Sequence, residues 1–109
     1  MKIFKLKDMK MGWFVGNFEP SAFNTKDFEV CFRTHPKGEI WDHHYHEKII
    51  EINLLTRGKM IMHGRELNQG DIFIISPYEI ANPIFLEDCD IVCIKTPSIP
   101  RDKIILENK

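Results

Sequence analysis

The stretch that decides the fold is Gly38-Glu39-Ile40-Trp41-Asp42-His43-His44-Tyr45-His46-Glu47-Lys48-Ile49-Ile50-Glu51-Ile52-Asn53-Leu54-Leu55-Thr56-Arg57-Gly58. Its first half is rich in histidine, and its second half alternates, with Ile50, Ile52 and Leu54 on one face and polar residues between them. Alternation with period two is typical of a β-strand. The stretch therefore predicts a strand that follows a histidine-rich segment and ends at a glycine turn.

The polar half of this stretch contains a candidate metal site. His44 and His46 are two residues apart, so in a strand they point to the same side with Cα atoms roughly 6.5 Å apart. A turn near Glu47 and Lys48 would bring Glu51 back beside them on the next strand. Two imidazoles and one carboxylate can hold a metal ion and leave positions open for substrate. The alternative is a polar turn at a strand end.

The rest of the chain repeats the same pattern of short runs cut by turn residues. The other runs cover residues 28–33, 59–63, 71–75 and 90–95. Turn signals stand at Arg57-Gly58, His63-Gly64-Arg65, Gln69-Gly70 and Ser76-Pro77, a spacing of roughly eight to twelve residues that is typical of a β-sandwich or barrel. We find no amphipathic helix, and Pro97 and Pro100 favour an extended strap at the C-terminal end. The prediction is one all-β domain over residues 1–109.

Composition limits the class of protein. The chain has 109 residues, of which 43% are hydrophobic, so it can bury one core. A net charge of −1 without a basic run argues against nucleic-acid binding. No apolar run is long enough for a membrane span or a signal peptide. Cys31, Cys89 and Cys93 are odd in number and widely spaced, which favours free thiols and a cytoplasmic location.

The stretch from Gly38 to Gly58 also resembles the first motif of the cupin family, which runs Gly, five residues, His-x-His, three or four residues, Glu, six residues, Gly. The positions that match are Gly38, His44, His46, Glu51 and Gly58. The resemblance implies a cupin-type double-stranded β-helix, which is a jelly-roll barrel. It also implies one divalent ion (Fe, Mn, Zn or Ni) held by His44, His46 and Glu51.

The second cupin motif is degenerate and covers residues 70–85. Gly70 opens it correctly, but Ala81 stands where the family has a metal-binding histidine and Phe85 where it has asparagine. We therefore expect the ion to be bound more weakly than in a typical cupin, or to be lost. The residues that could replace the missing ligand are Glu79, Asn82, His63 and His35.

Five residues are candidates for the wall of a ligand pocket: Arg33, His35, Trp41, Tyr45 and His63. Arg33 and His35 share strand parity, and Arg33 could bind a carboxylate or phosphate if that side is the interior. The alternative is an exposed edge face. Trp41 and Tyr45 flank the histidines, as aromatic residues do in small-molecule sites, or they pack across the barrel end.

The function follows less directly, because one fold hosts many functions. The resemblance implies a small polar ligand in the barrel mouth, such as a sugar derivative or an organic acid. Metal-dependent isomerase, epimerase or oxygenase-type chemistry would suit such a site. No acid–base pair is obvious beside the metal ligands, so a metal-free binding module remains open. A third reading is an accessory homodimer without catalytic activity, joined through methionine-rich and isoleucine-rich strand faces.

Overall fold

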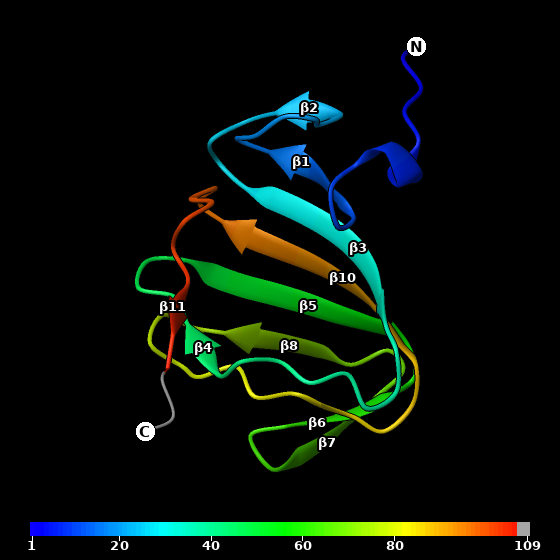
Figure 1. Ribbon diagram of the computed structural model, residues 1–109, viewed down its shortest axis with the longest axis vertical. Coiled ribbons are helices and arrows are strands. Elements are labelled where there is room, and N and C mark those ends of the chain that lie inside the picture. Colours follow the sequence, from blue (N-terminus) through cyan, green and yellow to red (C-terminus); the bar gives the residue numbers. More distant parts are fainter. Residues whose placement is uncertain (107–109) are drawn as a thin grey trace.

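The computed structural model describes residues 1–106, and nearly all its regular structure is β-strand. One large sheet of six strands has the order β2-β1-β3-β10-β5-β8 (Figure 1). Its strands are β1 (Trp13–Gly16), β2 (Phe23–Asn24), β3 (Glu29–His35), β5 (Ile50–Arg57), β8 (Ile72–Ile75) and β10 (Cys89–Thr96). The all-β prediction is confirmed, and the helical part of the described chain is the short 3-10 turn η1 (Leu6–Asp8).

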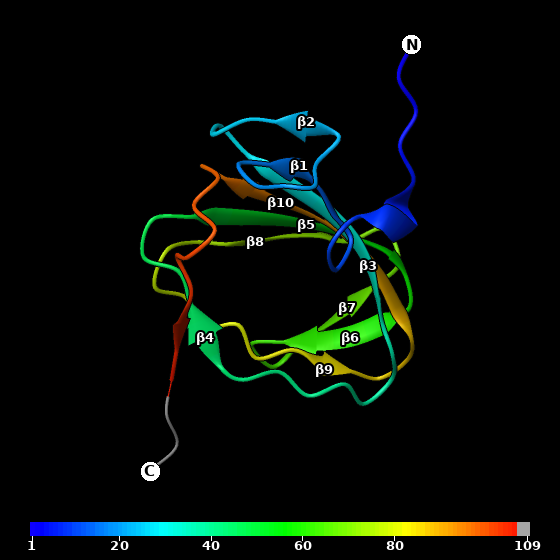
Figure 2. The same cartoon turned by 45° about the horizontal axis from the view of Figure 1, so that its top comes forward.

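Two smaller sheets close the barrel. A three-stranded sheet of order β7-β6-β9 faces the large sheet across the interior, and the β11-β4 pair lies at one side of the opening (Figure 2). These strands are β6 (Lys59–Met62), β7 (Arg65–Asn68), β9 (Ile84–Phe85), β4 (His44–Tyr45) and β11 (Ile104–Ile105). Two facing sheets made from one chain are the double-stranded β-helix that the sequence predicted.

The register of the large sheet determines which side chains face inward. In the antiparallel ladders of β10, Cys93 is opposite Cys31 on β3 and opposite Asn53 on β5. Along β5, Glu51, Asn53 and Leu55 are buried, whereas Ile50 and Leu54 are exposed. The inner face of β5 is therefore partly polar and its outer face apolar, which is the reverse of an ordinary half-buried strand.

The apolar core fills one part of the barrel. Its buried members are Leu55, Met60, Met62, Ile75, Ala81, Phe85, Cys89 and Ile91, and Trp41, Leu67 and Phe73 pack against them. Met60 and Met62 belong to this core, so they are not part of an outer face that could join two subunits. All three cysteines are buried and free, as predicted.

Gly58 makes the tight connection from β5 to β6. Its φ of 103° lies in the left-handed region, where residues with a Cβ atom are strained. A Cβ atom at this position would also lie 2.3 Å from the carbonyl oxygen of Asp88. The glycine of the first motif is therefore required by backbone geometry and by close packing. No helix in residues 1–106 is long and apolar enough to cross a membrane.

Candidate functional site

A cavity of about 610 Å³ occupies the interior of the barrel. Polar side chains from three neighbouring strands of the large sheet line it, namely Glu29, Cys31, Arg33 and His35 of β3, Glu51 and Asn53 of β5, and Cys93 and Lys95 of β10. Apolar walls come from Trp13, Trp41, Met60, Met62, Phe73 and Ile75. A volume of this size, with mixed walls, suits a small-molecule ligand.

His44 lies in β4 at the edge of this cavity. Its ring is buried, and Nδ1 lies 3.1 Å from the carbonyl oxygen of Asp42. Because a carbonyl oxygen can only accept a hydrogen bond, Nδ1 carries the proton and Nε2 keeps its lone pair. Burial lowers the pKa of His44, which also favours the neutral ring. His44 is therefore in the protonation state that a metal ligand needs.

His46 is held in the same tautomer by the C-terminal part of the chain. Its Nδ1 hydrogen-bonds to the backbone carbonyl oxygen of Asp102, so its Nε2 also keeps a lone pair. The rings of His44 and His46 have centroids 5.4 Å apart and an interplanar angle of 74°. The sequence-predicted pair therefore lies together, with both Nδ1 atoms occupied by backbone carbonyls.

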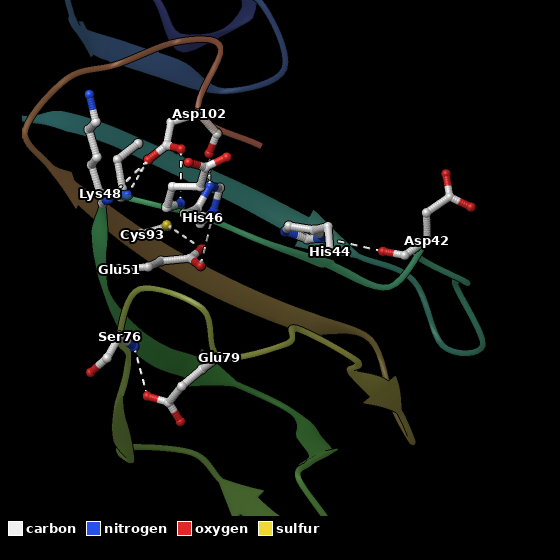
Figure 3. Close-up of polar contacts among 11 residues, drawn as sticks. Asp42, His44, His46, Lys48, Glu51, Ser76, Glu79, Cys93 and Asp102 are labelled. Atoms are coloured by element: carbon white, nitrogen blue, oxygen red, sulfur yellow. Dashed lines mark hydrogen bonds and ion pairs between the residues drawn. The ribbon is translucent and has the colours of Figure 1, made fainter. Parts of the chain in front are cut away.

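The carboxylate of Glu51 lies beside the ring of His46 (Figure 3). Oε1 accepts a hydrogen bond from the thiol of Cys93 over 3.1 Å, whereas Oε2 lies 3.9 Å from Nε2 of His46. Nε2 of His46 and Oε2 of Glu51 are both buried, and neither has a hydrogen-bond partner among the described residues. Leaving buried polar atoms unpaired costs about 1–3 kcal/mol each, so this pair calls for a third group between them.

Imidazole nitrogen and carboxylate oxygen are suitable donors for a divalent transition-metal ion. The two unpaired atoms and the tautomers of both histidines fit such an ion. Within residues 1–106, however, the structure has no group of three His, Cys, Asp or Glu side chains arranged closely enough to enclose one. In Figure 3, the ring of His44 is turned toward Asp42, farther from Glu51 than the ring of His46.

The buried thiol of Cys93 is part of the same cluster. The neighbouring thiol of Cys31, burial and the charge of Glu51 together raise the pKa of Cys93 strongly. The thiol therefore keeps its proton and can donate it to Glu51. This role cannot be recognised in the sequence, because Cys93 and Glu51 are 42 residues apart.

Ala81 takes the position that the degenerate second motif left without a histidine. It is only 1% exposed and forms an isolated antiparallel bridge with His44. Three of the four residues considered as replacements gather elsewhere: His63 lies 4.0 Å from Glu79, and its backbone N–H donates to the side chain of Asn82. None of these three lines the cavity.

Asp102 is a functional candidate that the sequence analysis missed. Its carboxylate accepts hydrogen bonds from the backbone N–H groups of Glu47, Lys48 and Ile49, over 2.9, 2.8 and 3.0 Å. Its own carbonyl oxygen accepts the hydrogen bond from His46. Asp102, in the C-terminal segment, thus fixes both the turn before β5 and the orientation of the predicted metal ligand His46. No local pattern could indicate this, because more than 50 residues separate the partners.

Three of the five predicted pocket residues line the cavity, namely Arg33, His35 and Trp41. The other two lie outside its lining. Tyr45 stacks on Tyr78 with ring centroids 5.7 Å apart, and His63 is exposed. The difference for Tyr45 follows from strand alternation, since it lies between His44 and His46 and points the other way.

His35 belongs to a polar cluster in the cavity wall. Its Nδ1 lies 2.6 Å from Oε2 of Glu39, and the indole N–H of Trp41 donates to the same oxygen over 2.9 Å. The ring stacks on Phe85 with centroids 4.9 Å apart and nearly parallel planes. Glu39 is a second residue that the sequence analysis missed, although it lies within the decisive stretch.

Comparison with known proteins rests on structure, since no protein-family model and no curated protein matches this sequence. A conserved protein from Klebsiella pneumoniae with a double-stranded β-helix domain matches over 99% of both chains, with 18% identity and a TM-score of 0.67. KdgF from Halomonas sp. matches 70% of this chain and 74% of its own, with 22% identity and a TM-score of 0.62. The DMSP lyase DddQ from Ruegeria pomeroyi matches 89% of this chain and 52% of its own, with 16% identity and a TM-score of 0.67. At these identities the likeness concerns the fold.

Proposed function

Because the chain has the double-stranded β-helix fold of the cupin superfamily, we propose that it is a small metal-binding cupin that takes a small polar ligand in its barrel. The ion would be held by His44, His46 and Glu51. One observation carries this proposal: Nε2 of His46 and Oε2 of Glu51 are buried, unpaired and 3.9 Å apart. A divalent ion would satisfy both atoms.

When bound, such an ion would polarise a carbonyl group or lower the pKa of a coordinated water. The chain itself contributes orientation and enclosure. Backbone carbonyls of Asp42 and Asp102 hold the two Nδ1 protons, so both Nε2 atoms remain available. The Cys93 thiol holds Oε1 of Glu51, which leaves Oε2 free to face His46. These hydrogen bonds orient the metal-ligating side chains without contacting the ion, as in many metalloproteins.

The ligand class follows from the walls of the cavity. Trp13 and Trp41 offer apolar aromatic surface, while Arg33, His35 and Asn53 offer polar groups. This mixture suits a sugar derivative or an organic acid better than an apolar molecule. The structural neighbours include proteins described as KdgF and as a DMSP lyase, and such different names support no single reaction for this chain.

Ala81 favours a second candidate, a metal-free cupin that binds its ligand by shape. A small, fully buried residue beside His44 removes one of the usual ligands, and a site with fewer ligands binds its ion less tightly. Both candidates agree with a homodimer that uses the outer face of the large sheet.

Elemental analysis of protein purified without an affinity tag tests the proposal. We expect close to one equivalent of a divalent transition metal in the wild type. His46→Ala should lose the metal and keep the strand-dominated circular dichroism spectrum. His43→Ala is the matched control, because His43 lies in the same segment but is exposed. Equal metal content in the two variants would contradict the ligand assignment, and metal-free wild type would favour the second candidate.

A further inference from the structure

Arg33 is a charged side chain in the cavity wall, and the described residues provide no charged partner for it. It is half-buried, and no carboxylate in residues 1–106 lies within ion-pair distance of its guanidinium group. Two carboxylates in this region are already occupied. Glu39 accepts from His35 and Trp41, and Asp90 pairs with Arg57 at 2.7 Å. A guanidinium group that is partly desolvated and unpaired is a suitable site for an anion.

The backbone packs closely against the stem of Arg33. A Cβ atom at Gly12 would lie 2.9 Å from Cγ of Arg33, and Gly12 has a φ of 80°. The carbonyl oxygen of Gly12 accepts a hydrogen bond from the N–H of Phe32 over 3.1 Å. This turn also brings Lys10 to the lining of the cavity. The Arg33 stem is therefore confined, and a second cation lies in the same lining.

His35 offers a hydrogen-bond acceptor two residues along the same strand. Its Nδ1 faces the carboxylate of Glu39, so Nδ1 carries the proton and Nε2 the lone pair. Nε2 of His35 has no hydrogen-bond partner in the described part of the chain. It is also not completely buried, so a ligand can reach it. Burial, together with the charge of Arg33, lowers the pKa of His35 against the opposing effects of Glu39 and Asp90. The neutral ring therefore accepts rather than donates through Nε2.

We propose that Arg33 and His35 form a subsite for a hydroxycarboxylate, with the carboxylate on Arg33 and a hydroxyl group donating to Nε2 of His35. The subsite deepens the proposed function by naming the ligand class. It depends on that proposal only for the other end of the ligand, which would face His44 and Glu51, the two proposed metal ligands that line the cavity. The contacts of Arg33 and His35 exist without a metal ion, so the subsite can be tested alone.

The test uses full-length protein from which metal has been removed by a chelator, so that chelation of an ion by the probe cannot contribute. Three four-carbon probes are compared by isothermal titration calorimetry: tartrate, succinate without the hydroxyl groups, and threitol without the carboxylates. We expect tartrate to bind most tightly and threitol at least about tenfold more weakly, a difference of about 1.4 kcal/mol. Binding of succinate should lie between them.

Two variants assign the two contacts. Arg33→Gln should weaken tartrate binding about tenfold or more, while Arg65→Gln, at an exposed arginine of β7, should leave it unchanged. His35→Phe keeps an aromatic ring on Phe85 but removes the acceptor, so tartrate should lose its advantage over succinate. If this variant fails to fold, nitrogen NMR of His35 in the wild type decides. Its Nε2 signal should move with tartrate and stay fixed with threitol.

Several outcomes would overturn the subsite: equal binding of tartrate and threitol, equal effects of the two arginine variants, or no binding of any probe. The proposed metal site fails by a different result, namely wild-type protein that holds no ion. Arginine-dependent binding of tartrate in such a protein would support the subsite while contradicting the metal site.

Discussion

His44 and Ala81 are directly opposed inside the barrel, and the N–H of Ala81 donates to the carbonyl oxygen of His44 over 2.7 Å. Opposed residues of an antiparallel pair have Cβ atoms about 4.5–5.5 Å apart on the same face. A side chain longer than that of alanine at position 81 would therefore lie beside the imidazole of His44. The expectation that residue 81 takes the place of the missing ligand thus has a geometric basis.

Replacing Ala81 by histidine should strengthen metal binding. We expect Ala81→His to bind its divalent ion at least about tenfold more tightly than the wild type, which corresponds to about 1.4 kcal/mol. Competition with a chromophoric chelator measures the affinity, and thermal unfolding shows whether the packed site tolerates the ring. Ala22→His, at the other alanine of the chain, is the control. An unchanged affinity in Ala81→His would mean that position 81 does not face the ion.

Asp102 should contribute to the loss of folding stability at acidic pH. Burial alone would raise the pKa of Asp102, but the N–H donors of Glu47, Lys48 and Ile49 hold it below its ordinary value. A folded-state pKa below the unfolded value of about 3.9 stabilises the fold above that pH, and the contribution disappears as the pH falls through the folded value. We expect Asp102→Asn to unfold at lower urea concentration than the wild type at pH 6.

The gap in stability between wild type and Asp102→Asn should narrow as the pH falls below about 4, because the carboxyl group of Asp102 is then protonated first in the unfolded and, at lower pH, in the folded protein. Other carboxylates titrate in the same range, so the comparison rests on the difference between the two unfolding midpoints at each pH. Asp42→Asn, at an exposed aspartate near the site, should show no such gap. A gap that stays constant from pH 3 to pH 6 would contradict the assigned role.

Much of this architecture is predictable from local sequence. The runs at residues 28–33, 59–63, 71–75 and 90–95 correspond to β3, β6, β8 and β10, because turn residues and period-two alternation are local properties. The short strands β2, β9 and β11, each of two residues, were missed. Such strands form through pairing between distant segments, as Ile104 does with Tyr45, and two residues carry no periodicity.

The candidate metal ligands could be named from the sequence, but the residues that hold them in place could not. The first motif indicated His44, His46 and Glu51, and their burial at 5%, 3% and 7% exposure agrees with an interior site. Asp102 and Cys93 support these residues from distant parts of the chain. These contacts depend on pairing between distant segments, such as β10 beside β5 in the large sheet, so no spacing in the sequence encodes them.

The outer face of the large sheet should join two copies of the chain. Apolar residues of β3, β10, β5 and β8 pair across this face in two rows. One row is Val30, Ile94, Ile52 and Ile74, and the next is Phe32, Val92, Leu54 and Ile72. Ile72 and Ile74 are 67% and 59% exposed, and exposed apolar patches of this kind favour association. We expect a homodimer at micromolar concentration in sedimentation velocity.

Ile74→Lys should shift this equilibrium to monomer, because a charge would be buried against an apolar face. Ile84→Lys is the matched control, since Ile84 is 55% exposed but belongs to β9 in the other sheet. If the wild type is monomeric up to high concentration, the outer face has another role. Dissociation by both variants alike would point to general destabilisation.

The thiol of Cys93 should matter for metal binding and not only for packing. Cys93→Ala removes the hydrogen bond to Oε1 of Glu51, so the carboxylate should no longer be held in one orientation. Changes to residues that orient metal ligands typically weaken metal affinity about 10–100-fold. Cys89→Ala makes the same substitution at another buried thiol, which donates instead to the carbonyl of Lys59. Both variants should lose thermal stability by a similar amount, and only Cys93→Ala should lose metal affinity in a chelator competition. Equal affinities in the two variants would show that the contact between Cys93 and Glu51 supports the fold alone.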